Sequence, residues 1–342
     1  MFAQIITDWY LVNKRDLPWR NTNDPYKIWL SEIILQQTRV EQGLDYYLKF
    51  IANYPTVFDL AVASEQDVLN LWQGLGYYSR ARNLHATAKY ISSDLFGVFP
   101  ATYSEIIKLK GVGPYTAAAI SSFAFQEVKA LVDGNVYRVL ARYFDMDIAI
   151  DSTIGKKQFQ ALADELIDAS KPDVYNQAIM EFGSQQCTPS APNCMQCVLN
   201  DTCLSLKNGT VTQRPVKEKK TKVRDRYFYF GIFKENDDIV IVKREERDIW
   251  QNMYQFPLIE STSRLTDSQI EEAFFELYQL RPISISLEVK HILSHQRIFA
   301  QFAHFSSLPT SGDFLRIKQV DLQNYPLPRL IDRFLEENDL IS

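Results

Sequence analysis

Two acidic residues in the first half of the chain have surroundings that favour opposite ionisation states. Glu32 lies in the stretch PYKIWLSEIILQQ and shares a helix face with three apolar side chains. These are Ile28, Trp29 and Leu35, and the desolvation they cause is expected to raise the pKa of Glu32. Asp133 precedes the amphipathic run VYRVLAR, where the N–H groups of a helix N-terminus would keep it ionised. A protonated acid and an anion together are suited to splitting a glycosidic bond.

Each carboxylate also has an explanation that involves no chemistry. Glu32 stands at the edge of its apolar stripe, and spacing alone slightly favours a side chain that leans towards solvent. Asp133 is a common type of helix N-cap, and capping alone accounts for it. The hypothesis of glycosidic chemistry therefore depends on the pair and not on either residue.

All four cysteines lie in one loop with the spacing C-x6-C-x2-C-x5-C, and they are Cys187, Cys194, Cys197 and Cys203. Disulfides confined to so short a loop would stabilise little else. Zinc sites usually combine two C-x2-4-C pairs, whereas only one such pair is present here. The spacing therefore favours a [4Fe-4S] cluster with a structural role, and zinc or unligated thiols are the alternatives.

The stretch LKGVGPYTAAAI places two glycines, Gly111 and Gly113, directly before an expected helix. Such a start leaves the first N–H groups uncovered and makes an anion site, which suits a nucleic-acid phosphate bound near Gly111, Gly113 and Thr116. A simple glycine turn explains the same pattern without a ligand.

The elements that position these residues fall into two domains. Residues 1–213 show helical periodicity almost throughout, and residues 227–342 change to strands at 227–233, 239–243, 284–292 and 298–305 with one helix at 267–280. Between them, residues 214–226 carry 7 basic and 2 acidic side chains. The positive charge of this strip contrasts with the net charge of −5 of the whole chain. The strip is either a solvated linker or a connector that follows the phosphates of a nucleic acid.

No apolar run approaches the roughly 20 residues of a membrane span, and the N-terminus does not look like a secretion signal. A cytoplasmic monomer is the expectation. Nothing in the sequence indicates an oligomer.

In this order, LKGVGPYTAAAI, LVDGNVYRV and the cysteine loop resemble the helix-hairpin-helix DNA glycosylases with an iron-sulfur cluster, the endonuclease III superfamily. LPWR at 17–20, SEIILQQTRV at 31–40 and LWQGLGYYSRARNLH at 71–85 resemble the MutY-type adenine DNA glycosylases within it. Strand-cleaving members carry a lysine at the position of Tyr115, and a tyrosine cannot form a Schiff base. The resemblance therefore implies a monofunctional glycosylase that removes adenine mispaired with 8-oxoguanine or guanine in double-stranded DNA.

The resemblance also assigns roles residue by residue. Glu32 is implied as the acid that protonates adenine N7, and Asp133 as the group that stabilises the sugar cation, with Tyr115 and Asn135 bonded around the same site. Residues implied around the flipped adenine are Arg15, Trp19, Arg20, Leu35 and Gln177. Gln37 and Tyr77 are implied as wedges in the base stack. The plainer explanation is a surface amide for Gln37 and a core aromatic residue for Tyr77.

The second half resembles the Nudix-like C-terminal domain of these enzymes, so the fold expected is multidomain: an all-α helix-hairpin-helix domain followed by a smaller α+β domain. Its helix lacks the glutamate-rich Nudix box, which favours recognition over hydrolysis. The family reads 8-oxoguanine with a Phe-Ser-His turn, and Leu293-Ser294-His295 occupies that place. Ser294 and His295 are carried over as recognition residues, while a turn histidine bonded to backbone is the alternative for His295.

Two other functions stay open at this point. One is a glycosylase of the same fold that removes thymine or uracil opposite guanine, because adenine selection depends on pocket residues inferred only from resemblance. The other is an iron-sulfur protein that binds damaged DNA without excising a base.

Overall fold

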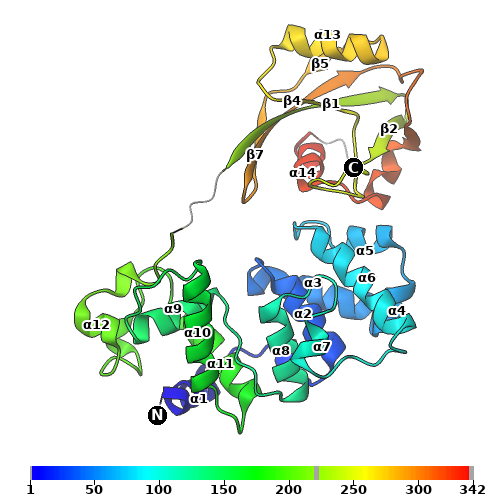
Figure 1. Ribbon diagram of the computed structural model, residues 1–342. Coiled ribbons are helices and arrows are strands. Elements are labelled where there is room, and N and C mark those ends of the chain that lie inside the picture. Colours follow the sequence, from blue (N-terminus) through cyan, green and yellow to red (C-terminus); the bar gives the residue numbers. More distant parts are fainter. Residues whose placement is uncertain (1, 219–222, 339–342) are drawn as a thin grey trace. The chain divides into compact units, whose positions relative to one another are not determined.

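The computed structural model describes residues 2–218 and 223–338 and divides the chain into two compact units. The first unit is formed by residues 1–62 and 83–219, and the second by residues 63–82 and 220–342. Figure 1 labels most of their helices and strands. Within the described ranges, no helix has the length and apolar character needed to cross a bilayer.

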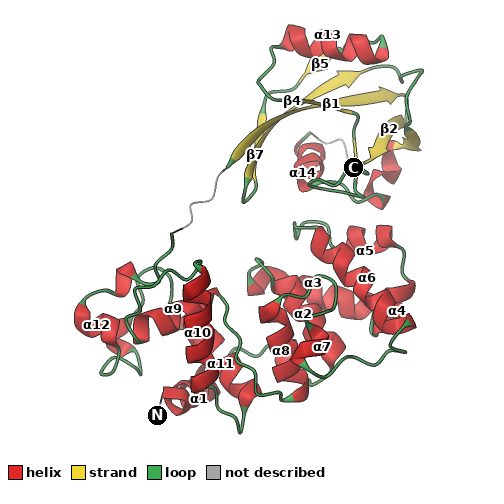
Figure 2. Ribbon diagram, viewed as in Figure 1, coloured by secondary structure: helices red, strands yellow, loops and turns green. Residues whose placement is uncertain are grey.

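All regular elements of the first unit within 2–218 are helices, as Figure 2 shows, which confirms the helical expectation. Its α-helices are α1 (Phe2–Asn13), α2 (Pro25–Leu35), α3 (Val40–Asn53), α4 (Val57–Val62), α6 (Ser79–Ser93), α7 (Tyr103–Ile106), α8 (Pro114–Phe125), α9 (Gly134–Tyr143), α10 (Thr153–Leu166), α11 (Pro172–Gln185) and α12 (Leu204–Asn208). Short 3₁₀ turns are η1 (Pro18–Arg20), η2 (Cys194–Gln196) and η3 (Val211–Gln213). Helix α6 begins in the second unit and continues into the first.

Local sequence signals explain the ends of the two helices that matter most for chemistry. Asp24 caps α2 by accepting a hydrogen bond from the N–H of Tyr26, with Pro25 in the first turn. Helix α2 ends at Leu35, two residues earlier than the sequence pattern suggested. Helix α8 begins after Gly113, and Gly111 has a φ of +79°, where any side chain would also meet Asn83.

The second unit is built around one mixed sheet with α5 (Glu65–Leu71), α13 (Asp267–Tyr278), η4 (Gln319–Asn324) and α14 (Arg329–Glu337). Its strands are β1 (Arg224–Glu235), β2 (Asp238–Lys243), β3 (Tyr254–Gln255), β4 (Leu258–Ser261), β5 (Ser284–Ile285), β6 (Val289–Ile292), β7 (Gln296–Phe305) and β8 (Leu315–Lys318). The main order is β3-β2-β1-β7-β5, and β4, β6 and β8 pair with β1, β7 and β2. The central pair β1 and β7 runs parallel, with Tyr227 opposite Phe299.

The two faces of this sheet carry different cores because successive strand side chains point to opposite sides. On one face, Tyr229 and Phe233 of β1 pack against Phe274 of α13. On the other, Phe302 of β7 stacks on Phe334 of α14 with ring centroids 3.6 Å apart. The result is the α+β layer arrangement expected for the second half.

The basic strip 214–226 is only partly described. Residues 219–222 lie outside the described residues, and β1 begins at Arg224, inside the range assigned to the linker. On the other side, the carbonyl oxygen of Val216 accepts a hydrogen bond from Ile150 N–H, and Asp151 accepts one from Glu218 N–H. Residues 216–218 therefore pair with the first unit and are not fully solvated.

Candidate active site and cysteine centre

A pocket of about 190 Å³ opens in the first unit where α2, α8, α11 and the N-terminus of α9 meet. Glu32, Tyr115, Asp133 and Asn135 all line it, although they come from three separate segments of the chain. Helix α9 approaches α11 closely at Gly183, where a Cβ atom would lie 2.8 Å from the Cβ of Asn135. The absence of a side chain at Gly183 thus lets the N-terminus of α9, with Asp133 and Asn135, pack closely against α11.

Glu32 is buried, with an exposed fraction of 7%. Its helix neighbours Ile28 and Trp29 are buried as well, at 2% and 0%. Burial raises the pKa of Glu32 to about 7, and the hydrogen bond with Tyr115 lowers it only in part. The side chain does not lean towards solvent, and at neutral pH it is poised to donate a proton.

Asp133 caps α9 as the sequence suggested. Its carboxylate accepts hydrogen bonds from the backbone N–H groups of Asn135 and Val136, at 2.8 and 2.7 Å, and from the side-chain amide of Asn135 at 2.8 Å. Burial nevertheless raises its pKa above the usual value, and these hydrogen bonds oppose that rise without cancelling it. The N–H groups expected to hold the anion are in place, but the sequence did not reveal how deeply the helix N-terminus is buried.

Tyr115 stands in the first turn of α8 with its hydroxyl 3.2 Å from the sulfur of Met180. Burial raises the pKa of Tyr115 well above its usual value, and the charges of Glu32 and Asp133 raise it further. The phenol is therefore a neutral hydrogen-bond donor in the same pocket as the two acids. Asn135 in turn accepts a hydrogen bond from Arg138, which fixes the orientation of its amide.

The residues that the sequence placed around a flipped base also line this pocket, and they are Arg15, Trp19, Arg20, Leu35 and Gln177. Gln177 accepts a hydrogen bond from the hydroxyl of Tyr10 at 2.7 Å, which joins α1 to α11. Sequence reasoning missed Glu181, one helical turn after Gln177 on the same face of α11. The spacing of four residues was the signal that would have found it.

The start of α8 keeps the expected backbone geometry. Gly113 has no side chain and Pro114 has no N–H, so the N–H groups of Tyr115 and Thr116 begin the helix outside its hydrogen-bond ladder. Thr116 is buried, and its hydroxyl accepts a hydrogen bond from Gln36. A phosphate contact by Thr116 would therefore use its backbone N–H and not its side chain.

A second pocket, of about 550 Å³, lies within the second unit. Tyr77, Leu293, Ser294 and His295 line it, and the hydroxyl groups of Tyr77 and Ser294 are hydrogen-bonded. Tyr77 is 43% exposed, so it is not a core aromatic. Tyr77 and Gln37 both have positive backbone φ values, of 48° and 57°. Residues other than glycine rarely adopt such values, and those that do cluster at functional sites.

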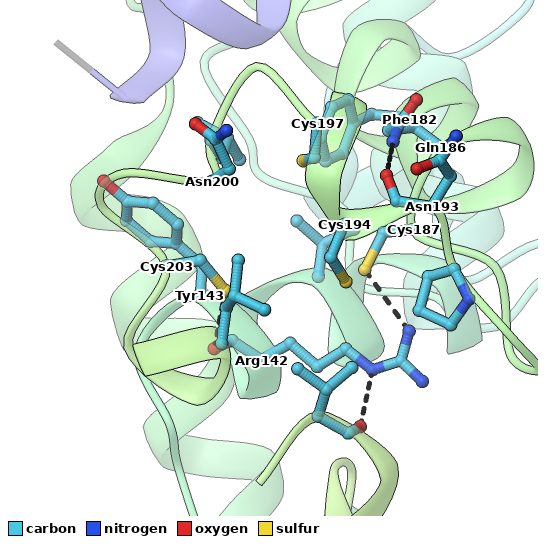
Figure 3. Close-up of a pocket in the computed structure, with 15 residues that line it drawn as sticks. Arg142, Tyr143, Phe182, Gln186, Cys187, Asn193, Cys194, Cys197, Asn200 and Cys203 are labelled. Carbon is cyan, nitrogen blue, oxygen red and sulfur yellow. Dashed lines mark hydrogen bonds between the residues drawn. The ribbon is translucent and has the colours of Figure 1, made fainter. Parts of the chain in front are cut away.

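The four cysteines line one cavity of about 30 Å³. Figure 3 shows them around it together with Arg142, whose guanidinium lies 3.5 Å from the sulfur of Cys187. The same guanidinium donates to backbone carbonyls of Thr188, Pro189 and Val211. Throughout 2–218 and 223–338, no group of three or more His, Cys, Asp or Glu residues is arranged to hold a metal ion.

Two families match different parts of the chain. Residues 30–167 match the family described as HhH-GPD superfamily base excision DNA repair proteins, and residues 228–337 match the NUDIX domain. The adenine DNA glycosylase of Buchnera aphidicola subsp. Baizongia pistaciae is 36% identical over 306 residues, covering 87% of this chain and 84% of that protein. The chain belongs to the adenine DNA glycosylase family. The human adenine DNA glycosylase is 42% identical over 211 residues, which are 59% of this chain and 39% of that one.

Solved structures agree with the fold of the first unit. A thermostable thymine-DNA glycosylase aligns with a TM-score of 0.56 at 30% identity, covering 60% of this chain and 95% of that one. An endonuclease III in a non-covalent DNA complex aligns with a TM-score of 0.53 at 20% identity, covering 61% of this chain and 94% of that one, which shows the shared fold alone.

The lining of the cysteine cavity suits the cluster expected for this family, although the thiols do not converge on the position of a single ion. Its walls include the apolar side chains of Val139, Leu199 and Leu206, and the positive charge of Arg142 would offset the negative charge of ligated thiolates. Burial raises the pKa values of the thiols of Cys197 and Cys203, so these groups need a metal centre to hold them as thiolates.

Proposed function

We propose that this chain hydrolyses the N-glycosidic bond of adenine mispaired with 8-oxoguanine in double-stranded DNA, as the first step of base excision repair. The observation that carries the proposal is the shared pocket of Glu32 and Asp133, in which one acid is biased to keep its proton and the other accepts three hydrogen bonds. Membership of the adenine DNA glycosylase family supports the choice of adenine.

The reaction begins when the adenine is turned out of the duplex into the pocket. Glu32 transfers its proton to N7, which makes adenine a better leaving group, and the bond between C1′ and N9 breaks with its electrons passing to the base. Asp133 stabilises the sugar cation that remains. Water adds to C1′, and one of its protons returns to Glu32, which restores the starting acid.

Tyr115 decides that the product is an abasic site and not a cleaved strand. A lyase needs an amine that attacks C1′ and forms a Schiff base, and a phenol that burial keeps neutral supplies no such group. Tyr115 instead donates a hydrogen bond to Glu32 and helps to hold the carboxyl group in place.

The second unit recognises the base opposite the adenine. Ser294 and His295 are exposed at the turn between β6 and β7, where an oxidised guanine could contact His295 and could take the place of Tyr77 as the partner of the Ser294 hydroxyl. Tyr77 lines the same pocket and is suited to wedge into the base stack when the adenine is flipped. The same role is proposed separately for Gln37. Leu293 keeps an apolar contact but supplies no aromatic ring for stacking.

The four cysteines would hold a [4Fe-4S] cluster that fixes the fold of the loop 187–203, and Arg142 of α9 contacts that loop at Cys187, Thr188 and Pro189. When bound, the cluster supplies a structural link and no group for the excision chemistry. Iron and acid-labile sulfide assays of the purified protein would distinguish it from zinc.

Release of free adenine from an A:8-oxoguanine duplex is the test of the function. The expected result is adenine release, slower from an A:G duplex, with an intact strand until alkali is added. Thymine release from a T:G duplex without adenine release would support the second candidate, which the 30% identity to a thymine-DNA glycosylase favours. DNA binding that Glu32→Gln and Asp133→Asn leave unchanged, with no base released by any variant, would support the non-catalytic candidate.

A further inference from the structure

Glu181 is the most deeply buried charged group of the active-site pocket, with an exposed fraction of 1%. Its carboxylate forms a two-pronged ion pair with Arg15, at 2.8 Å from Nε to Oε1 and 2.6 Å from Nη2 to Oε2. The guanidinium of Arg20 donates to Oε2 at 2.7 Å. One carboxylate thus holds two arginines that come from a segment far away in the sequence.

Further hydrogen bonds complete this arrangement. Glu181 also accepts from the backbone N–H of Arg15 at 3.0 Å and from the side-chain amide of Gln185. Arg20 donates to the carbonyl oxygen of Arg15 at 3.2 Å and lies over the ring of Tyr10, 5.7 Å from its centroid. Because several donors saturate both oxygens, Glu181 is not a group that would itself accept a proton from a substrate.

The ionisation of Glu181 follows from these contacts. Burial by itself raises the pKa of Glu181, but the hydrogen bonds from Arg15 and Arg20 outweigh burial and hold the pKa well below its usual range. The carboxylate is therefore charged at every pH at which the enzyme would work. It cancels one of the two positive charges that the arginines bring to the pocket.

The charge next to Glu32 matters because the positive field of Arg20 favours loss of the Glu32 proton. The titratable and charged groups that face this pocket from all its elements are Arg15, Arg20, Glu32, Tyr115, Asp133 and Glu181. With all of them in place, the two positive charges of Arg15 and Arg20 are balanced by the negative charges of Asp133 and Glu181. Without Glu181, the balance would favour the ionised form of Glu32.

We propose that Glu181 is a positioning residue for excision, which fixes Arg15 and Arg20 against the base pocket and balances their charge so that Glu32 retains its proton. The proposal rests on the function proposed above. Glu181 then has two separable effects on excision. The length of its side chain places the arginines, and its charge sets the pH range in which excision proceeds.

The test measures single-turnover release of adenine against pH for the full-length protein and for Glu181→Gln. Wild type should lose activity as pH rises through the pKa of Glu32, about 7. In Glu181→Gln this decline should lie about one pH unit lower, so the rate falls about tenfold at pH 8 but only about twofold at pH 6. If Glu181 served only folding, Glu181→Gln would lower the rate by the same factor at every pH.

Glu181→Asp is the matched control, because it keeps the charge and shortens the side chain. It should lower the rate by a similar factor throughout and leave the midpoint of the decline unchanged. A uniform loss in Glu181→Gln, or the same displaced midpoint in Glu181→Asp, would overturn the proposal.

Arg20→Gln provides a second measurement that does not depend on whether Glu181→Gln folds. Removing this positive charge should move the decline to higher pH, opposite to Glu181→Gln, and the double variant Arg20→Gln/Glu181→Gln should return it close to wild type. A decline that stays in place in Arg20→Gln contradicts the charge balance. Failure of wild type to release adenine at any pH would instead refute the proposed function, so the two failures are distinguishable.

Discussion

Replacing Glu32 by glutamine should greatly slow excision and at the same time stabilise the protein at neutral pH. The carboxyl group of Glu32 has a pKa of about 7 in the folded protein, against 4.5 for the ordinary group. The folded state therefore binds more protons than the unfolded state between these values, and its stability falls as pH rises through that interval. Glutamine has a similar shape and no charge to desolvate, so the variant avoids this loss.

The size of the effect follows from the two pKa values. A difference of about 2.5 between them corresponds to roughly 3 kcal/mol of unfolding free energy, at about 1.4 kcal/mol for each tenfold change in the proton equilibrium. The gain of Glu32→Gln over wild type should be near zero below pH 4.5 and should reach its full value above pH 7. Loss of the proton donor should lower the single-turnover rate by about 10² to 10⁴-fold.

Thermal unfolding at a series of pH values between 4.5 and 8 measures the stability difference, and single-turnover release of adenine measures the rate. Glu165→Gln is the matched control, because Glu165 is exposed on α10 and its replacement removes the same charge without relieving burial. Stability curves of Glu32→Gln and wild type that run parallel across this range would refute the idea that Glu32 is held protonated by burial. So would excision by Glu32→Gln at the wild-type rate.

Other predictions follow from the same residues. Tyr115→Lys should gain some strand cleavage, because an amine then faces C1′, and borohydride should trap its covalent adduct with DNA; no trapped adduct would count against this. Asp133→Asn should slow excision by about 10²-fold or more, since the sugar cation loses its anion, while duplex binding persists. Ser294→Ala combined with His295→Ala should bring the excision rates of A:8-oxoguanine and A:G closer together, and an unchanged ratio would contradict the recognition role. Cys197→Ser should lower the iron content and the thermal midpoint together, and full iron content in that variant would exclude Cys197 as a ligand.

Part of the second unit was accessible from the sequence and part was not. Strands β1 and β2 contain runs of consecutive buried residues, and β7 alternates buried with partly buried positions, so these patterns were readable, with ends that differ by a few residues. Strands β3 and β8 have two and four residues. Elements this short carry too little periodicity to be recognised, and pairing with β2 is what makes them strands.

The sequence by itself determined the helical character of residues 2–213, the caps of α2 and α9 and the isolation of four cysteines in one loop, because each of these depends on neighbours along the chain. Only the tertiary structure decided that Glu32, Asp133 and Tyr115 open into one pocket, and that Glu181 clamps Arg15 and Arg20. It also decided that Asp133 is buried and that its pKa is raised, whereas the apolar stripe around Glu32 had already indicated a raised pKa for that residue. The extent of desolvation depends on which helices pack around a group, and the local pattern of residue types does not determine it.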